Sequence, residues 1–414
     1  MRILVVPTSD WIGHPTPSRL HHIFEKLAER NEVHVLRFRL YSERKLTTKT
    51  IVHEVEQFDF KGLAAYYIVN APRHFSSVRK IIKENHIDTV VVSNLLAGYM
   101  AAKASKGLAA AAFDLSDYFP TSGAGYYFSI DSILGRVATQ SLESLLKKTL
   151  ELVSETVTCS YPLQDYVKRL GVRNVCVIAN GVDEFFLESG RRGDEIREEF
   201  GLDGHVAIGY LGSIEFWLDM HTLLRALHSM KSKGLKVKLF LVGAQLRTSS
   251  AHALKDEMKG LGIEDSVVWL NSFVPYRDVP NYIDAMDICT IPFDRNNPTA
   301  YYSAPNKLWE YLALKKPVIT TPIPDPMMQA GQYIDVAWNS QDYVRIVQDY
   351  IKDPDRYREK ASSATGLVLD LLPPSCFTPY ISVPDGYSDC EARQPILDMG
   401  SDFTTLVLNR RIDV

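Results

Sequence analysis

Short apolar runs alternate with amphipathic stretches along most of the chain. The run Arg2–Val6 is typical of a buried strand, and residues 18–30 repeat their apolar positions at a helical period, with Ser18 as the expected N-cap. Further strands are predicted at 33–36, 88–93, 109–113, 156–158 and 175–178. This alternation favours a parallel sheet that is covered by helices on both faces.

The same alternation starts again at about residue 205. Strands are predicted at 206–211, 237–242, 267–270, 288–291 and 317–320, with helices between them. Residues 187–204 are charged and contain glycines, as expected for a linker with one short helix. We therefore predict an α/β protein with two Rossmann-like, doubly wound domains, at 1–186 and 205–365. Ligands of such sheets bind at the carboxyl ends of the strands.

Residues 366–414 break this pattern. They contain several prolines, Cys376 and Cys390 but no lysine, and their helical periodicity is poor. We separate them as an atypical C-terminal tail, to which the pattern assigns no role.

Composition and charge narrow the function classes. The 414 residues carry 46 Lys and Arg against 50 Asp and Glu, a net charge of -4, which excludes an overall basic surface for nucleic acid. The five cysteines form no CxxC pair, and no His lies at metal-ligand spacing, which predicts free thiols and no metal site. The first residues lack the apolar run of a signal peptide, so we expect a cytoplasmic protein.

A group of basic residues leaves peripheral contact with an anionic inner membrane face open. Scattered surface charge is the simpler explanation. The group consists of Arg37, Arg39, Arg44, Lys45 and Lys49.

Two glycine-containing loops follow predicted strands. Gly13 permits close approach of the backbone to an anion, but its local sequence alone favours a plain connection. In GYLGSIEFW, Gly212 could admit a phosphate and Ser213 could donate from its hydroxyl, while a tight turn without a ligand is equally well supported.

The segment SAPNKLWEYLAL, residues 303–314, is more informative. Ser303 is a candidate helix cap, which places Lys307 in the first turn of the helix. A cation there opposes the helix dipole by a few tenths to ~1 kcal/mol, so the position points to an anionic ligand. Glu310 lies on the same helix face. Either the two side chains form an ordinary surface ion pair, or Lys307 binds a phosphate while Glu310 accepts hydrogen bonds from a diol.

Asp114 and Asp117 lie at the end of the predicted strand 109–113. Carboxylates at this edge could bind sugar hydroxyls. Aspartate is also common in turns, and the turn is slightly favoured for both residues.

Taken together, these segments resemble family 4 of the retaining, nucleotide-sugar-dependent glycosyltransferases with the GT-B fold, in a subgroup with an SxPxKxxEY motif. The matches run in the family's order from residue 1 to about residue 350 and include VIANGVD, GYLGSIEFW and KLWEYLALKKPVITT. The resemblance implies an acceptor-side domain at 1–186 and a donor-nucleotide domain at 205–365.

The resemblance also implies roles for particular residues. Glu310 matches the second glutamate of the family's EX7E motif, which holds the ribose hydroxyls, and Tyr302 stands at the first glutamate. Ser213 stands where the family has an arginine on the diphosphate, so Lys307, helped by Arg295, is the candidate replacement. Asp114, on the acceptor side, joins Lys307 as a candidate catalytic residue. The other expected donor contacts are Gly13, Gly212, Phe273 and Val274.

We predict retaining transfer of a sugar from a nucleoside diphosphate sugar to a hydroxyl of a carbohydrate or lipid-linked acceptor, in polysaccharide or glycoconjugate synthesis. Lys307 would stabilise the negative charge that grows on the leaving diphosphate, so no metal and no cofactor beyond the donor is expected. Tyr302 and Ser213 motivate one alternative, a sugar-nucleotide-binding protein without catalysis. A sugar-nucleotide epimerase is a weaker alternative, because the NGVD and KLWEY matches favour the transferase.

Overall fold

The computed structural model describes residues 1–371 except 15–16, 41–45, 61, 189 and 245–247. These described residues belong to one compact unit. Most of the expected tail, residues 372–414, lies outside them.

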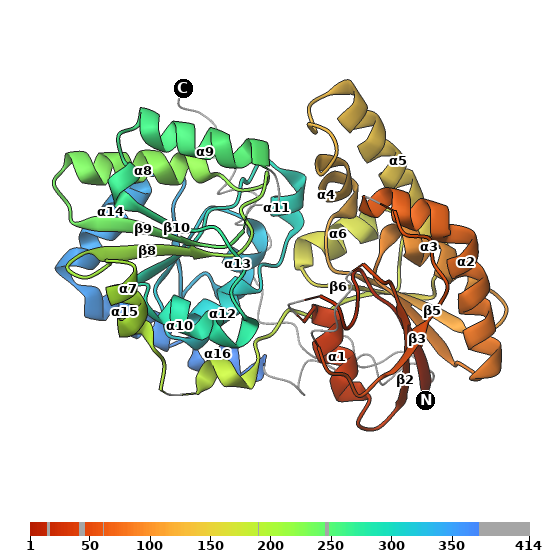
Figure 1. Ribbon diagram of the computed structural model, residues 1–414. Helices are drawn as coiled ribbons and strands as arrows, with labels where there is room; N and C mark the ends of the chain where they lie inside the picture. Colours follow the sequence, from red (N-terminus) through yellow and green to blue (C-terminus); the bar gives the residue numbers. More distant parts are fainter. Residues whose placement is uncertain (15–16, 41–45, 61, 189, 245–247, 372–414) are drawn as a thin grey trace. The chain divides into compact units, whose positions relative to one another are not determined.

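Seven parallel strands form the first sheet, in the order β3-β2-β1-β4-β5-β6-β7. Figure 1 shows α1 on one face of this sheet and α2 and α3 on the other. The strands are β1 (Arg2–Val6), β2 (Glu32–Arg37), β3 (Ile51–Glu54), β4 (Thr89–Val92), β5 (Ala110–Leu115), β6 (Glu155–Thr158) and β7 (Val175–Val177). The helices are α1 (Arg19–Leu27), α2 (Leu63–Glu84), α3 (Leu95–Ser105), α4 (Phe119–Gly125), α5 (Ile133–Leu150) and α6 (Tyr161–Arg169). We call this sheet with its helices the first lobe.

Six parallel strands form the second sheet, in the order β10-β9-β8-β11-β12-β13. They are β8 (Val206–Leu211), β9 (Val237–Val242), β10 (Val267–Leu270), β11 (Ile288–Ile291), β12 (Val318–Thr320) and β13 (Asp335–Val336). The helices are α7 (Gly193–Glu199), α8 (Met220–Ser232), α9 (Thr248–Gly260), α10 (Val279–Asp284), α11 (Pro298–Tyr302), α12 (Lys307–Ala313), α13 (Pro324–Ala330), α14 (Ser340–Lys352), α15 (Pro354–Ser362) and α16 (Thr365–Asp370). We call this sheet with its helices the second lobe.

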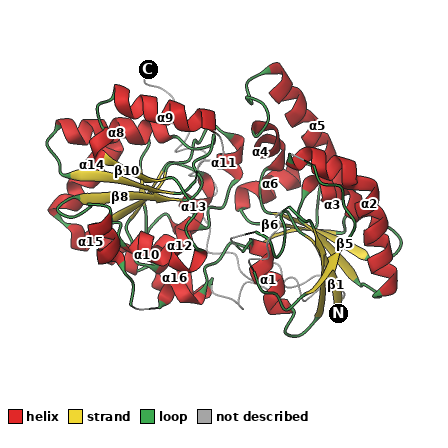
Figure 2. Ribbon diagram, viewed as in Figure 1, coloured by secondary structure: helices red, strands yellow, loops and turns green. Residues whose placement is uncertain are grey.

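The two sheets confirm the predicted pair of doubly wound halves, each with strands between layers of helices (Figure 2). In both, the strand order reverses at one point, between β1 and β4 and between β8 and β11. Ligands of such sheets bind at this switch point, outside the carboxyl ends of the strands. The loops after β1 and β8, which contain Gly13 and Gly212, are therefore placed for binding.

Each sheet packs into its own hydrophobic core. The core of the second lobe, called the second core below, includes Val182 and Phe186, although both lie inside the expected first domain of residues 1–186. It also includes Val368 of α16, so the start of the expected tail packs against the second lobe.

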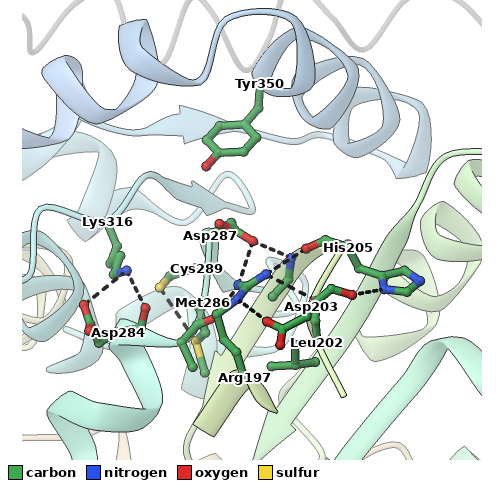
Figure 3. Close-up of polar contacts among 12 residues, drawn as sticks. Arg197, Leu202, Asp203, His205, Asp284, Met286, Asp287, Cys289, Lys316 and Tyr350 are labelled. Carbon is green, nitrogen blue, oxygen red and sulfur yellow. Dashed lines mark hydrogen bonds and ion pairs between the residues drawn. The ribbon is translucent and has the colours of Figure 1, made fainter. Parts of the chain in front are cut away.

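The expected linker contains one helix, α7, which Arg197 fixes to the second lobe (Figure 3). Its guanidinium donates to the Asp287 carboxylate at 3.0 Å and to the His205 carbonyl at 2.9 Å. The same carboxylate oxygen of Asp287 accepts from the Ala207 amide at 2.8 Å. Because these bonds join α7 to the start of β8 and to the residue before β11, the helix is a fixed part of this lobe.

Among the described residues, no helix combines the length and apolar character that a membrane crossing needs. The basic group is not a continuous surface in its described part, because Arg37 is only 4% exposed and pairs with Asp10. Lys49 is exposed and pairs with Glu29. Arg39 is also exposed and pairs loosely with Asp59, at 3.8 Å. Arg44 and Lys45 lie outside the described residues.

Candidate functional site

The loop after β8 holds the backbone in a tight, glycine-dependent conformation. Gly212 has a φ of 136°, a value that favours glycine, and its amide donates to the Val242 carbonyl at 2.9 Å. A Cβ on Gly243 would lie 2.0 Å from the Gly212 carbonyl oxygen, so the loops after β8 and β9 touch through glycine backbones. Ser213 contributes its carbonyl, which accepts from the Tyr210 hydroxyl at 2.9 Å.

Lys307, the first residue of α12, reaches this loop. A Cβ on Gly212 would lie 3.2 Å from Lys307 Cε and 3.4 Å from Nζ. The ammonium lies 5.2 Å from the ring centroid of Tyr210 and 5.0 Å from that of Phe293. Burial lowers the pKa of Lys307, and the Glu310 carboxylate opposes this only in part. A cation is thus held in an apolar setting directly beside the glycine loop.

Glu310 lies one helical turn after Lys307, but the two do not form a close ion pair. Within the described part of the chain, no carboxylate lies at ion-pair distance from the Lys307 ammonium. Burial raises the pKa of the Glu310 carboxyl, and Asp183 raises it further, while Lys307 lowers it. Lys307 and Glu310 therefore do not form the ordinary surface ion pair that was one of the two interpretations of this helix face.

Three side chains from separate elements meet next to Glu310. His22 Nδ1 of α1 lies 3.2 Å from Asp183 Oδ1, and the Tyr276 hydroxyl also hydrogen-bonds to Asp183. Burial alone would raise the pKa of Asp183, but the bonds from His22 and Tyr276 outweigh it and the pKa is lowered. Glu310 thus faces a fixed carboxylate that ends the NGVD segment.

The start of α12 corrects one prediction. Ser303 does not cap this helix: it ends α11, and its hydroxyl donates to the Ala300 carbonyl at 2.8 Å. Asn306 is the residue that precedes α12. Lys307 nevertheless lies in the first turn, as predicted.

In the loop after β1, the amide of Gly13 is already occupied. It donates to Asp10 Oδ1 at 3.1 Å, and Asp10 is fully buried. Arg37 Nε lies 3.1 Å from the same oxygen. This buried ion pair fixes the loop. The Gly13 amide is therefore not available to donate a hydrogen bond to an anion.

Asp114 is a strand residue rather than a turn residue. It lies within β5, is 1% exposed, and pairs with Arg19 at 3.3 Å. Arg19 also donates to Asn180 Oδ1 at 3.0 Å. Asp117 follows the strand and accepts from the Tyr118 amide at 2.8 Å, and burial raises its pKa to about 6. The turn interpretation is wrong for Asp114, whose carboxylate is bound by Arg19.

Tyr302 packs into an aromatic cluster. Its ring centroid lies 4.9 Å from that of Tyr118 and 5.3 Å from that of Tyr166. Its backbone carbonyl accepts from Ser160 at 2.7 Å. The Tyr302 side chain therefore packs among tyrosines.

The other predicted donor residues lie on loops of the second lobe. The Arg295 guanidinium lies over Trp338, 5.5 Å from the ring centroid. Phe273 follows β10 and is 59% exposed, whereas Val274 packs on the second core. Gly212, Lys307 and Glu310 are the predicted residues that the structure brings together. His22, Asp183 and Tyr276 join them, and of these three only Asp183 lies in a motif, NGVD, that the sequence analysis singled out.

Two family models match the chain. Residues 18–184 match the model for Glycosyltransferase Family 4, and residues 205–353 match the model for Glycosyl transferases group 1. The chain is also similar to TuaH of Bacillus subtilis (strain 168), a proposed teichuronic acid biosynthesis glycosyltransferase. The two are 24% identical over 185 residues, which is 44% of this chain and 44% of TuaH. The match thus spans less than half the length of this curated relative.

Solved structures share the fold over nearly the whole chain. Anabaena HepE in complex with UDP and glucose has a TM-score of 0.69 and 18% identity, covering 92% of this chain and 98% of HepE. Sucrose-phosphate synthase from Thermosynechococcus elongatus has a TM-score of 0.71 and 12% identity, covering 90% of this chain and 95% of that chain. At these identities the likeness establishes the two-lobed fold.

Proposed function

Because the chain belongs to family 4 of the GT-B glycosyltransferases, we propose that it transfers a sugar from a nucleoside diphosphate sugar to a hydroxyl of a carbohydrate or lipid-linked acceptor, with retention of configuration. UDP-glucose is the first donor to test, since structures of HepE were solved with UDP and with UDP-glucose. A role in polysaccharide synthesis is proposed from the likeness to TuaH.

One observation carries this proposal: the Lys307 ammonium lies beside the Gly212 loop at the switch point of the second sheet, with no close carboxylate partner in the described chain. A diphosphate there would approach the backbone of a residue without a Cβ and meet a positive charge. Such a ligand also offsets the desolvation that lowers the pKa of Lys307.

The proposed mechanism needs little more than positioning and charge. The bond from the sugar C1 to the leaving phosphate oxygen breaks, the bond from C1 to the acceptor oxygen forms, and the acceptor proton passes to the leaving phosphate. Lys307 stabilises the charge that grows on that phosphate. Glu310, when ionised, accepts hydrogen bonds from the ribose hydroxyls. Asp114 acts by holding Arg19 rather than by taking a proton, because its carboxylate is already bound.

The test is Lys307→Ala, assayed for turnover of UDP-glucose and for UDP-glucose affinity. Removing one charge-stabilising donor lowers turnover by about 100-fold or more, and we expect the dissociation constant to change much less. Lys236→Ala, at an exposed lysine before β9, is the matched control and should behave as wild type. An unchanged rate in Lys307→Ala would remove this residue from the mechanism.

Binding without catalysis is the second candidate function. It is favoured by Tyr302, which stands at the family's first glutamate and packs against Tyr118. Measurable donor binding with neither transfer to a broad acceptor set nor donor hydrolysis would support it.

A further inference from the structure

A cavity lies in the first lobe. It measures about 450 Å³ and is lined by residues of the β2 and β3 ends, by the segment after β3, and by Arg73 of α2. Arg37 and Glu54, the last residues of the two strands, pair directly in the sheet. The cavity is therefore at the carboxyl edge of the first sheet, and its volume falls in the range of small-molecule sites.

Arg37 forms the floor of this cavity and is paired with two carboxylates. Arg37 is buried and donates to Glu54 at 2.7 Å and to Asp10 at 3.1 Å. Its carbonyl accepts from Gln57 Nε2 at 2.7 Å. Since Asp10 also holds the Gly13 amide, the floor continues into the loop after β1.

Phe58 forms a fixed aromatic wall. The amide of Phe58 donates to Asn70 Oδ1 at 2.8 Å, and Asn70 Nδ2 donates back to its carbonyl at 2.9 Å. Asn70 is fully buried. The Arg73 guanidinium lies 3.8 Å from the ring centroid, yet 48% of Phe58 remains exposed. Asn70 holds the Phe58 backbone and Arg73 covers part of the ring, while the rest of its surface stays open.

Hydrogen-bond donors and hydrogen-bond acceptors both line the rest of the cavity. Gln57 Oε1 is buried and has no hydrogen-bond partner within the described chain. Among the described residues, Arg39 forms a loose ion pair with Asp59, at 3.8 Å and with both side chains exposed. Glu56 adds an exposed carboxylate. Three guanidiniums and two carboxylates line the cavity together. An anion would be attracted by the first and repelled by the second, whereas a neutral, hydroxyl-rich ligand uses both the donors and the acceptors.

We propose that this cavity binds a neutral pyranose unit of the acceptor, with the apolar face of the sugar ring against Phe58 and its hydroxyls on Gln57 and Arg39. That this sugar belongs to the acceptor rests on the proposed function. The inference adds a sugar subsite that is distinct from the donor residues.

The experiment measures binding of methyl glycosides of glucose, galactose, mannose, rhamnose and N-acetylglucosamine to the full chain by saturation-transfer NMR and titration. Sodium glucuronate and sodium phosphate are the anionic probes. At least one neutral glycoside should bind to wild type, and Phe58→Ala should weaken it about tenfold or more. Phe58→Trp should retain binding, because it keeps an aromatic face.

Phe60→Ala is the matched control, since Phe60 is 51% exposed but does not line the cavity. Thermal unfolding checks that Phe58→Ala is folded, and Gln57→Leu gives a second variant that should weaken binding without touching the ring. Absence of neutral binding to wild type, preference for glucuronate or phosphate, or equal losses in Phe58→Ala and Phe60→Ala would overturn the inference.

UDP-glucose affinity, measured on the same samples, separates this inference from the proposed function. Phe58→Ala should bind UDP-glucose as wild type does. If the donor binds but no neutral glycoside does, the cavity assignment fails alone. If glycosides bind in a Phe58-dependent way but no nucleoside diphosphate sugar binds, the sugar site stands and the proposed transfer fails.

Discussion

Lys307 carries the charge on which the proposed reaction depends, and its setting predicts an unusual pH dependence. Burial lowers the pKa of its ammonium, so the cation is lost at a lower pH than in an exposed lysine. Rising pH should therefore weaken UDP binding as it passes through this lowered pKa. Lys307→Arg stays charged and should flatten the alkaline side of the profile. Calorimetric titrations of both proteins from about pH 6 to about pH 10 test this, and superimposable profiles would contradict it.

The sequence could not predict contacts between side chains that are far apart along the chain. Lys307 and Glu310 stand out because they share one helix face within a motif. Arg19 and Asp114 meet although 95 residues separate them, and His22 reaches Asp183 from another element. No local pattern marks such pairs, since only the packed sheet brings them together. Tyr302 stood at a motif position, but its packing against Tyr118 depends on the folded chain.

At the scale of elements, Arg197 ties α7 to the second lobe through several hydrogen bonds. Arg197 bonds to Asp287 and to the His205 carbonyl, and Asp287 in turn accepts from the Ala207 amide (Figure 3). Arg197→Ala leaves these groups without their partner, so we expect about 2–4 kcal/mol of lost stability in denaturant unfolding.

Arg192→Ala is the control for this prediction. Arg192 is 58% exposed and forms only loose ion pairs at 3.7 Å and 3.9 Å. Its loss should change stability by less than about 0.5 kcal/mol. Equal effects of the two substitutions would show that α7 is not fixed by Arg197.

Most strands could be predicted because they are buried on both faces and therefore apolar throughout. Ile3, Leu4 and Val5 of β1 are at most 2% exposed. The edge strand β3 was missed because Ile51 and Glu54 are exposed, which leaves no buried run to detect. β13 has two residues, too few for any periodicity. The wrong cap at Ser303 has a similar origin: α11 ends there, and the short α12 begins without a side-chain cap.

For the whole molecule, the proposed function places the donor on the second lobe. Hydrogen exchange of the full chain with saturating UDP should therefore show added protection at residues 209–219 and 303–314, because a bound ligand stabilises the segments it contacts. β4 and α3, in the first lobe, provide the internal control and should exchange as in the free protein. Protection confined to the first lobe would contradict the assignment.

The most direct measurement is isothermal titration of wild type and Glu310→Ala with a panel of nucleoside diphosphate sugars that includes UDP-glucose. Glu359→Ala, at an exposed glutamate of α15, is the matched control. We expect at least one donor to bind to wild type and to the control, and Glu310→Ala to lose more than tenfold in affinity, about 1.4 kcal/mol or more. A folded wild-type protein that binds none of the donors would contradict this expectation, as would equal affinities in all three proteins.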